Sequence, residues 1–271
     1  MPPPEKLYVY EIHGRLHPPP GLAGADFLGC WREGDYTYLF FSAPKEAEVQ
    51  GWLAAHPGQG RYSSETVLNY TDWEAGQHLM PIRVAGFYLC PVWDTPAPEP
   101  GDLLIRLEPG LAFGSGWHPT TRLCLRLLRR VCQEARPTQV LDLGTGTGVL
   151  ALAALALGAR QVVAVEYNDL AVRAAQRNIR HNAREREILL IQGDARQFAY
   201  PAADLALANI HLEVLLDLLQ LPDFLDKRRY IFSGLLGTQV EQFRSALAAS
   251  PLKPVQILDE NLWFAVLAEG P

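Results

Sequence analysis

Residues 140–148 read Val-Leu-Asp-Leu-Gly-Thr-Gly-Thr-Gly, an apolar segment that runs into three alternating glycines and then into an apolar helix. Glycine lets the backbone turn tightly and lets a ligand lie directly against it. A dinucleotide site requires the spacing G-x-G-x-x-G, and here the third glycine, Gly148, comes one position early. The segment therefore predicts a ligand-binding loop at the carboxyl end of a buried strand and argues against a dinucleotide.

Outward from this loop, short apolar segments alternate with helical ones, which indicates an α/β fold with a parallel, doubly wound sheet. We predict strands at residues 139–143, 161–166, 188–192, 204–210 and 229–235, and helices at 120–132, 149–157, 170–182, 211–221 and 238–249. Two further strands, 255–258 and 262–268, have no helix between them. They predict an antiparallel hairpin at one edge of the sheet.

Acidic residues stand at the ends of three successive predicted strands, beside the glycines Gly144 and Gly146. Asp142 in the loop suits an ammonium group, such as that of S-adenosylmethionine, and is a poor neighbour for a pyrophosphate. Glu166 can accept both ribose hydroxyls, and Asp194 can meet an adenine amino group. Each acid taken alone is equally well explained as structural. The three together favour S-adenosylmethionine as the cofactor.

A second candidate site follows the fourth strand, which ends in Ala208-Asn209-Ile210. The side-chain carbonyl of Asn209 can accept hydrogen bonds from an amine and orient its lone pair toward a methyl group. Position alone leaves an equal alternative, in which Asn209 caps the next helix. Upstream, residues 108–121 form a glycine-rich segment typical of a lid. There Thr121 can be a simple helix cap, and His118 is expected to form hydrogen bonds within the loop rather than act as a base.

Composition limits the other possibilities. The 271 residues, 48% hydrophobic and 20% charged, can bury a core, and the net charge of −6 argues against direct nucleic-acid binding. The four cysteines show no spacing of a disulfide framework or metal site. The start, MPPPEK, shows no secretory signal, and the longest apolar run is about half of the ~20 residues that a membrane span needs. We therefore expect a cytoplasmic protein without metal or membrane association.

The first third of the chain differs from the rest. Strands are predicted at 7–12 and 36–41, with a turn at 33–35, and polar, proline-rich segments follow. Residues 1–80 hold five basic and ten acidic side chains, so most of the excess acidity lies there. We predict an N-terminal domain at residues 1–68, a linker at 69–80 and a catalytic domain at 81–271. The acidic domain could steer a basic partner, although scattered solubilising acids are the plainer explanation.

Several segments together resemble the bacterial methyltransferases of large-subunit ribosomal protein L11, the PrmA family. They are Glu-Pro-Gly-Leu-Ala-Phe-Gly-Ser-Gly-Trp-His-Pro-Thr-Thr at 108–121, Asp-Leu-Gly-Thr-Gly-Thr-Gly-Val-Leu at 142–150, Ala-Asn-Ile at 208–210 and Ser-Gly-Leu-Leu at 233–236. The resemblance implies a small α+β N-terminal recognition domain and a seven-stranded, Rossmann-like methyltransferase sheet. It implies methylation of lysine and N-terminal amines on a ribosomal protein. It places cofactor contacts at Phe113, Thr121, Gly144, Glu166 and Asn209.

The sequence departs from that family at several positions. Glu166 stands where an aspartate is usual, Tyr167-Asn168-Asp169 replaces an acid followed by proline, and Trp117 replaces a residue that is commonly threonine. The N-terminal segment leaves little room for a first helix. We expect a monomeric amine methyltransferase with Asn209 as its catalytic residue. The alternatives are a methyltransferase of another protein or a small molecule, a non-catalytic cofactor-binding module whose amine channel Trp117 blocks, and a nicotinamide-dependent dehydrogenase.

Overall fold

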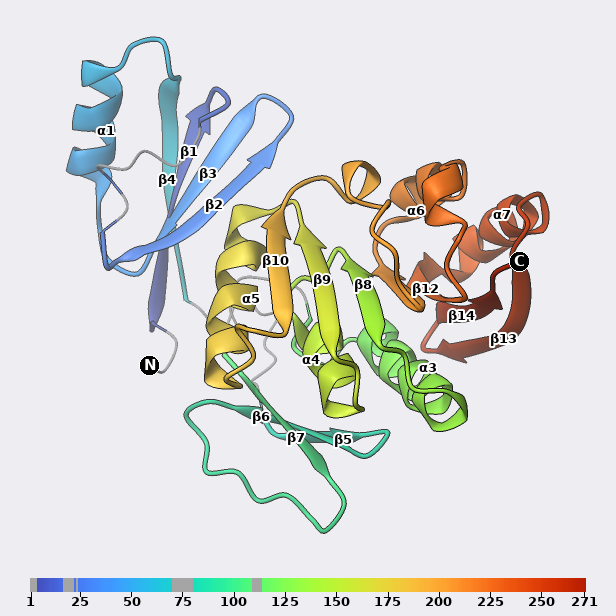
Figure 1. Cartoon of the computed structure of the whole chain (residues 1–271). Coiled ribbons are helices and arrows are strands. Elements are labelled where there is room, and N and C mark those ends of the chain that lie inside the picture. Colours follow the sequence, from blue (N-terminus) through green and yellow to red (C-terminus); the bar gives the residue numbers. More distant parts are fainter. Residues whose placement is uncertain (1–3, 17–21, 23, 70–79, 109–113) are drawn as a thin grey trace.

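The computed structural model describes residues 4–16, 22, 24–69, 80–108 and 114–271. Within them the chain forms three sheets, one of four strands, one of three and one of seven. Figure 1 shows the seven-stranded sheet with its helices in the middle and to the right, the four-stranded sheet at the upper left and the three-stranded sheet below. The predicted linker, residues 69–80, falls almost entirely outside the described residues.

The large sheet has the strand order β10-β9-β8-β11-β12-β14-β13. Its strands are β8 (Gln139–Leu143), β9 (Gln161–Glu166), β10 (Ile188–Gln192), β11 (Leu205–Asn209), β12 (Arg229–Leu236), β13 (Lys253–Glu260) and β14 (Trp263–Glu269). The first five in this order are parallel, and β14 and β13 run antiparallel at the edge. The predicted seven-stranded, doubly wound sheet with a terminal hairpin is confirmed.

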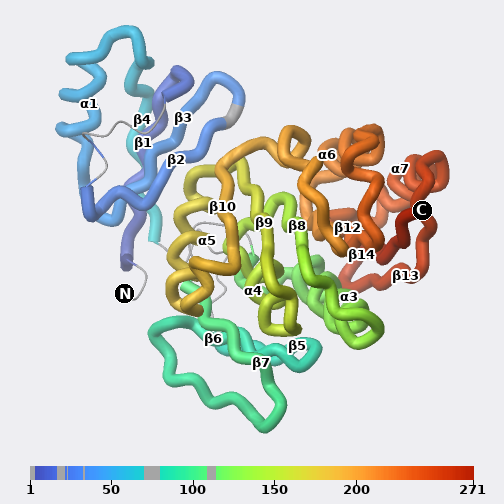
Figure 2. The backbone as a smooth tube through the Cα atoms, in the orientation of Figure 1, coloured from blue at the N-terminus to red at the C-terminus, as the bar shows by residue number. Residues whose placement is uncertain are grey.

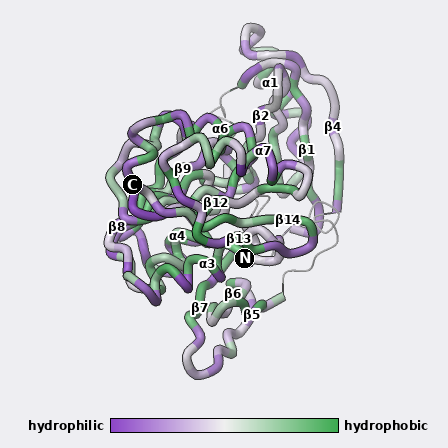
Figure 3. Tube along the Cα trace, turned by 90° about the vertical axis from the view of Figure 1, so that its right-hand side faces the viewer, coloured by the Kyte–Doolittle hydropathy of each residue, from purple (hydrophilic) through white to green (hydrophobic). Residues whose placement is uncertain are grey.

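Helices cover both faces of this sheet, because each face buries its own apolar cluster. The helices of the first face are α3 (Pro119–Glu134), α4 (Val149–Ala156) and α5 (Asp169–His181), and those of the second are α6 (Leu212–Leu218) and α7 (Gly237–Ala248). Strand β14, which lies between β12 and the edge strand β13, also buries apolar side chains, and most of its tube is green, for hydrophobic residues, in Figure 3. Residues 265–268 of this strand are buried.

The N-terminal sheet has the order β2-β3-β1-β4, with all neighbours antiparallel. It contains β1 (Lys6–His13), β2 (Phe27–Glu33), β3 (Tyr36–Phe41) and β4 (Arg61–Asn69), and helix α1 (Glu46–Ala55) packs on one face. The strands predicted at 7–12 and 36–41 and the turn between 33 and 36 are present. The sequence did not predict β2, α1 or β4. Among residues 14–16, 22 and 24–26, which are the described residues between β1 and β2, there is no helix.

A small sheet connects the two parts of the chain. It is formed by β5 (Ile82–Val84), β6 (Phe87–Pro91) and β7 (Leu103–Leu107), three strands that the sequence did not predict. All five residues of β6 are buried. The apolar side chains of this sheet join the cluster formed by α3 and α4, so it extends the core below the large sheet.

The second face of the N-terminal sheet packs against the start of α5, where the two lie side by side in Figure 2. Leu7, Val9 and Phe40 form one buried cluster with Leu170 of α5. The backbone N of Cys30 donates to Asp169 Oδ2 at 3.4 Å. Gly29 lets β2 come this close, since its φ is +148° and a Cβ there would lie 2.5 Å from Leu170 Cδ2.

Replacing Gly29 by alanine should therefore loosen this contact. We expect Gly29→Ala to destabilise the protein by about 1–3 kcal/mol through overpacking and backbone strain. Chemical denaturation and limited proteolysis of the N-terminal segment measure the effect. Gly51→Ala is the matched control, because Gly51 lies in α1 with nothing within 4 Å of the position that a Cβ would take, and it should gain about 0.5–1 kcal/mol from alanine's helix propensity. Equal stability of both variants would contradict the expectation.

Candidate active site

A cavity of about 790 Å³ opens along the carboxyl ends of the parallel strands. This is the edge where doubly wound sheets bind their ligands, and the volume is that of a small-molecule site. It is lined by Trp31, His118, Thr120, Gly144, Gly146, Val165, Glu166, Tyr167, Asn168, Leu170, Ala171, Gly193, Asp194, Ala195, Arg196, Asn209, Ile210, His211, Val214, Gly234, Leu236, Gln239 and Trp263. The structure thus brings together five of the predicted site residues, namely Gly144, Gly146, Glu166, Asp194 and Asn209.

The glycine loop has the left-handed backbone that its sequence predicts. Gly144, Gly146 and Gly148 have φ values of +72°, +57° and +82°. A Cβ on Gly144 would lie 2.9 Å from Ile210 Cδ1, so a side chain here would both strain the backbone and crowd the cavity wall. The loop is held to the next strand because the backbone N atoms of Gly144 and Thr145 donate to Val165 O at 2.8 and 3.0 Å.

Glu166 ends β9 and stands at the cavity with both oxygens oriented by backbone groups. Its Oε2 accepts from Gly146 N at 3.0 Å, and its Oε1 accepts from Asn168 N at 2.9 Å. Burial raises the pKa of Glu166, and the backbone N–H groups oppose that shift. Each oxygen keeps a further lone pair, so the carboxylate can still accept hydrogen bonds from two hydroxyls of a ligand.

Asp142 lies beneath the loop instead of on the cavity surface. It is 1% exposed, and its Oδ2 accepts from Thr145 Oγ1 at 2.5 Å. Its Oδ1 is buried without a hydrogen-bond partner among the described residues. Burial raises the pKa of Asp142 to about 7, with the nearby Glu166 adding to the shift. Its predicted contact with an ammonium group stays a prediction, and its visible role is to hold the loop.

Asp194 lines the cavity, but Arg196 occupies its carboxylate. Arg196 Nη2 lies 2.7 Å from Asp194 Oδ2, and Arg196 N donates to Asp194 Oδ1 at 2.9 Å. These contacts lower the pKa of Asp194. Arg196 also pairs with Asp217 at 2.9 Å, so the guanidinium holds both acids in place. This partner was not predicted, although its position two residues after Asp194 offered a signal.

Asn209 is the last residue of β11, and its side chain does not cap a helix. The next helix, α6, has His211 as its N-cap, so the capping alternative is wrong. Asn209 Oδ1 is buried and has no hydrogen-bond partner among the described residues. A buried amide oxygen without a partner is costly, which identifies it as an acceptor available to a ligand.

At the start of α3, the helix cap and the unpartnered hydroxyl belong to different residues. His118 is the N-cap, and its Nδ1 lies 2.8 Å from Thr120 Oγ1. Its expected role as a hydrogen-bonding loop residue is confirmed, and burial together with Arg122 lowers its pKa. Thr121 is not the cap. Its Oγ1 is buried and unpartnered among the described residues, but it does not line the cavity. Phe113 lies outside the described residues.

Two tryptophans of the cavity wall were not predicted. Trp31 comes from β2 of the N-terminal sheet, and Trp263 begins β14 and packs edge-on against His118 at 4.7 Å. Trp117, in contrast, is not among the lining residues, and its Nε1 donates to Met80 O at 3.2 Å. No motif surrounds Trp31 in the sequence. Its place in the cavity wall could not be predicted because it depends on how the N-terminal sheet packs against α5.

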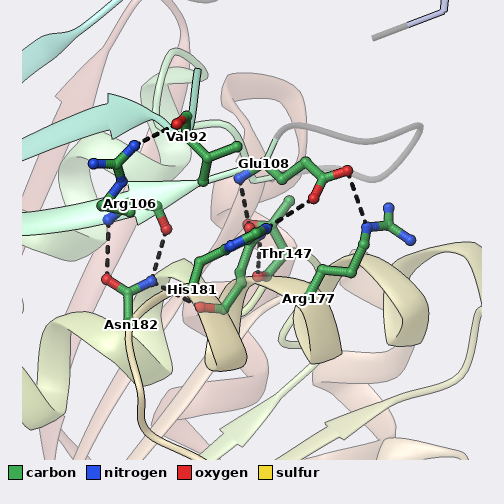
Figure 4. Close-up of polar contacts among 8 residues, drawn as sticks. Val92, Arg106, Glu108, Thr147, Arg177, His181 and Asn182 are labelled. Carbon is green, nitrogen blue, oxygen red and sulfur yellow. Dashed lines mark hydrogen bonds and ion pairs between the residues drawn. The ribbon is translucent and has the colours of Figure 1, made fainter. Parts of the chain in front are cut away.

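The glycine loop is also tied to the segment that leads into the predicted lid (Figure 4). Asn178 of α5 is fully buried; its Nδ2 donates to Thr147 O at 3.0 Å, and its Oδ1 accepts from Glu108 N at 2.6 Å. The Glu108 carboxylate pairs with Arg177 at 3.3 Å and contacts His181 at 2.9 Å. Within the predicted lid, Thr147 Oγ1 also donates to Gly114 O at 2.7 Å. The lid is thus fixed to the loop at Glu108 and at Gly114.

The family model for ribosomal protein L11 methyltransferase (PrmA) matches residues 42–270, which is most of the chain. The chain belongs to this family. A ribosomal protein L11 methyltransferase of Symbiobacterium thermophilum is 38% identical over 231 residues, which cover 83% of this chain and 73% of that protein. Its counterpart from Geobacter sulfurreducens is 38% identical over 215 residues, covering 74% and 67%.

A solved structure supports the same assignment. The crystal structure of a ribosomal protein L11 methylase from Lactobacillus delbrueckii subsp. bulgaricus superposes with a TM-score of 0.64 at 32% identity, covering 71% of this chain and all of that one. The family resemblance read from the sequence is therefore confirmed. Among the described residues of this PrmA member, no three His, Cys, Asp or Glu side chains gather to hold a metal ion. No helix in the same part of the chain is long and apolar enough to cross a membrane.

The buried Asp142 predicts a pH dependence of stability. Its folded pKa of about 7 lies above the ordinary value of 3.8, so its contribution is fully present at low pH and is lost as the pH rises toward and through 7. We expect the unfolding free energy of the wild type to fall by on the order of 4 kcal/mol relative to Asp142→Asn between pH 4 and pH 8. Urea titrations across this range measure it. Parallel pH profiles of the two proteins would show that Asp142 titrates normally.

Proposed function

We propose that this protein methylates amino groups, on lysine side chains and at the N-terminus, of ribosomal protein L11. The observation that carries the proposal is Asn209 Oδ1, a buried acceptor without a partner among the described residues, in a cavity shared with the glycine loop and Glu166. The names of the relatives give the substrate protein. The amine as acceptor group rests on the chemistry of Asn209.

The cavity fits S-adenosylmethionine as the methyl donor, which supplies a methyl group activated by a sulfonium. Glu166 is oriented by two backbone N–H groups and can accept the ribose hydroxyls. Gly144 leaves room on the cavity wall that a Cβ would fill. Gly193, beside Asp194, has a different role, since a Cβ there would lie 2.3 Å from Phe198 Cε2 and its absence lets that ring pack closely.

Asn209 lies where the bound cofactor and the acceptor amine would meet. β8 and β11 are neighbours in the sheet, so the loop after β8 and the end of β11 adjoin each other at the carboxyl edge. The amide oxygen can accept an N–H from the acceptor amine and so aim the nitrogen lone pair at the donor. A lysine amine, with an ordinary pKa near 10.4, has to be deprotonated before it reacts. His118 is engaged with Thr120, so we assign proton loss to water rather than to a side chain.

The alternative functions fit less well. The glycine spacing and the family both disfavour a dehydrogenase. A channel blocked by Trp117, the basis for a non-catalytic module, does not agree with its side chain binding Met80 away from the cavity. We further propose a monomeric, cytoplasmic enzyme that acts on the protein without binding nucleic acid directly, in line with the net charge of −6.

Removal of the Glu166 carboxylate tests the cofactor site. Glu166→Ala should weaken S-adenosylmethionine binding about 10- to 100-fold, since hydrogen bonds to a charged group contribute about 1.5–3 kcal/mol. Isothermal titration calorimetry measures the dissociation constant. The exposed Glu185 provides a matched control, and Glu185→Ala should bind as the wild type does. Undiminished binding by Glu166→Ala would remove the ribose assignment.

Removal of the Asn209 amide tests the chemistry. With labelled S-adenosylmethionine and purified ribosomal protein L11, Asn209→Ala should lose about 100-fold or more in kcat, because orientation of the amine is lost. Mass spectrometry of the product identifies the methylated amines. Calorimetry of the same variant separates a loss of turnover from a loss of cofactor binding. Full turnover by Asn209→Ala would show that the amide only stabilises the end of β11.

A further inference from the structure

The turn between β13 and β14 has an unfavourable backbone at an exposed leucine. Asn261 and Leu262 have φ values of +50° and +67° and connect Glu260 to Trp263, which pair across the hairpin. A two-residue hairpin turn with positive φ at both positions is the type I′ turn, in which asparagine followed by glycine is strongly preferred. Leucine in the second position is a costly choice, because its Cβ crowds the backbone in the left-handed region.

Burial does not offset this cost, since the side chain of Leu262 is 77% exposed. Strained residues that persist without a packing reason tend to lie at functional sites. The strand pairing shows where this one lies. Trp263 pairs with Leu236 at the end of β12, and Gly237 N donates to Leu262 O at 2.8 Å. Leu236 and Trp263 both line the active-site cavity.

The sheet order places this turn at the end of the cavity formed by β12 and β14. Glu166 and Asp194 follow β9 and β10, at the opposite end of the sheet from β12 and β14. Gly144 and Asn209 follow β8 and β11, in between. The residues assigned to the adenosine therefore lie on one side of Asn209, and the turn lies on the other side, where the acceptor amine has to enter.

We propose that Leu262 and the 38% exposed Leu236 form an apolar rim at which the polypeptide substrate packs while its amine reaches Asn209. The occupant is the chain of the substrate protein next to the methylated amine, and apolar side chains or methylene groups contact the two leucines. This inference rests on the proposed function. It follows from the continuity of the rim with the cavity and from a conformation that favours glycine but carries an exposed leucine.

Replacing Leu262 by glycine should relieve backbone strain and so raise stability, but it should also remove the substrate contact and so weaken recognition. Leu262→Gly creates the preferred Asn-Gly turn, so its melting temperature should rise by about 2 °C. Its KM for ribosomal protein L11 should rise about 10-fold, because the apolar contact is lost. The kcat and the dissociation constant for S-adenosylmethionine should stay unchanged. A purely structural residue would not combine higher stability with weaker substrate use.

Two further variants complete the experiment. Leu262→Ala keeps the strain and loses the contact, so it should raise KM without raising the melting temperature, and Leu262→Met should restore a KM near that of the wild type. Leu189→Ala is the matched control, since Leu189 is an equally apolar, exposed residue on β10, at the far end of the sheet. An unchanged KM in both Leu262→Gly and Leu262→Ala overturns the rim while leaving the proposed function in place. A wild-type protein that does not methylate ribosomal protein L11 overturns both.

Discussion

The left-handed backbone after β8 is the constraint on which the rest of the site depends. Because Gly144 and Gly146 have positive φ, the backbone N–H groups of Gly144 and Thr145 point to Val165 of the neighbouring strand. The N–H group of Gly146 points to Glu166. The same turn brings the Thr145 hydroxyl back onto Asp142. The loop thus hydrogen-bonds to both the buried acid Asp142 and the cavity acid Glu166 and joins them in one polar unit.

This unit extends beyond the loop through α5. The end of α5 nearest β9 packs against the N-terminal sheet through Leu170, and its interior carries Asn178, which bonds both the loop at Thr147 and the start of the lid at Glu108. One helix therefore joins the N-terminal sheet, the glycine loop and the lid. Trp31 reaches the cavity by the same packing, so the N-terminal sheet contributes to the wall of the active site as well as lying next to it.

Local patterns in the sequence were sufficient to predict the strands of the large sheet but not those of the N-terminal part. Strands such as Gln161–Glu166 are continuous apolar runs between helices, and each can be recognised from its own residues. Strand β4, Arg61–Asn69, is almost entirely exposed and owes its conformation to pairing with β1, which lies over fifty residues away. The positions of Glu166 and Asn209 followed from strand ends. The engagement of Asp194 by Arg196 and the place of Trp31 did not, because they depend on side-chain pairing and on the packing of two sheets.

Two of the ten acidic residues in the first 80 positions accept hydrogen bonds from tyrosine hydroxyls within the N-terminal part. Glu65 accepts from the Tyr10 hydroxyl and Glu46 from the Tyr62 hydroxyl, on the face of the sheet that packs against α1. That face is opposite to the one that contacts α5, and fields from exposed charges fall off over about 10 Å at moderate salt. These acids are therefore badly placed to guide an amine into the cavity. The proposed rim of Leu236 and Leu262 is better placed to contact the substrate, because Leu236 and its strand partner Trp263 line the cavity that also contains Asn209.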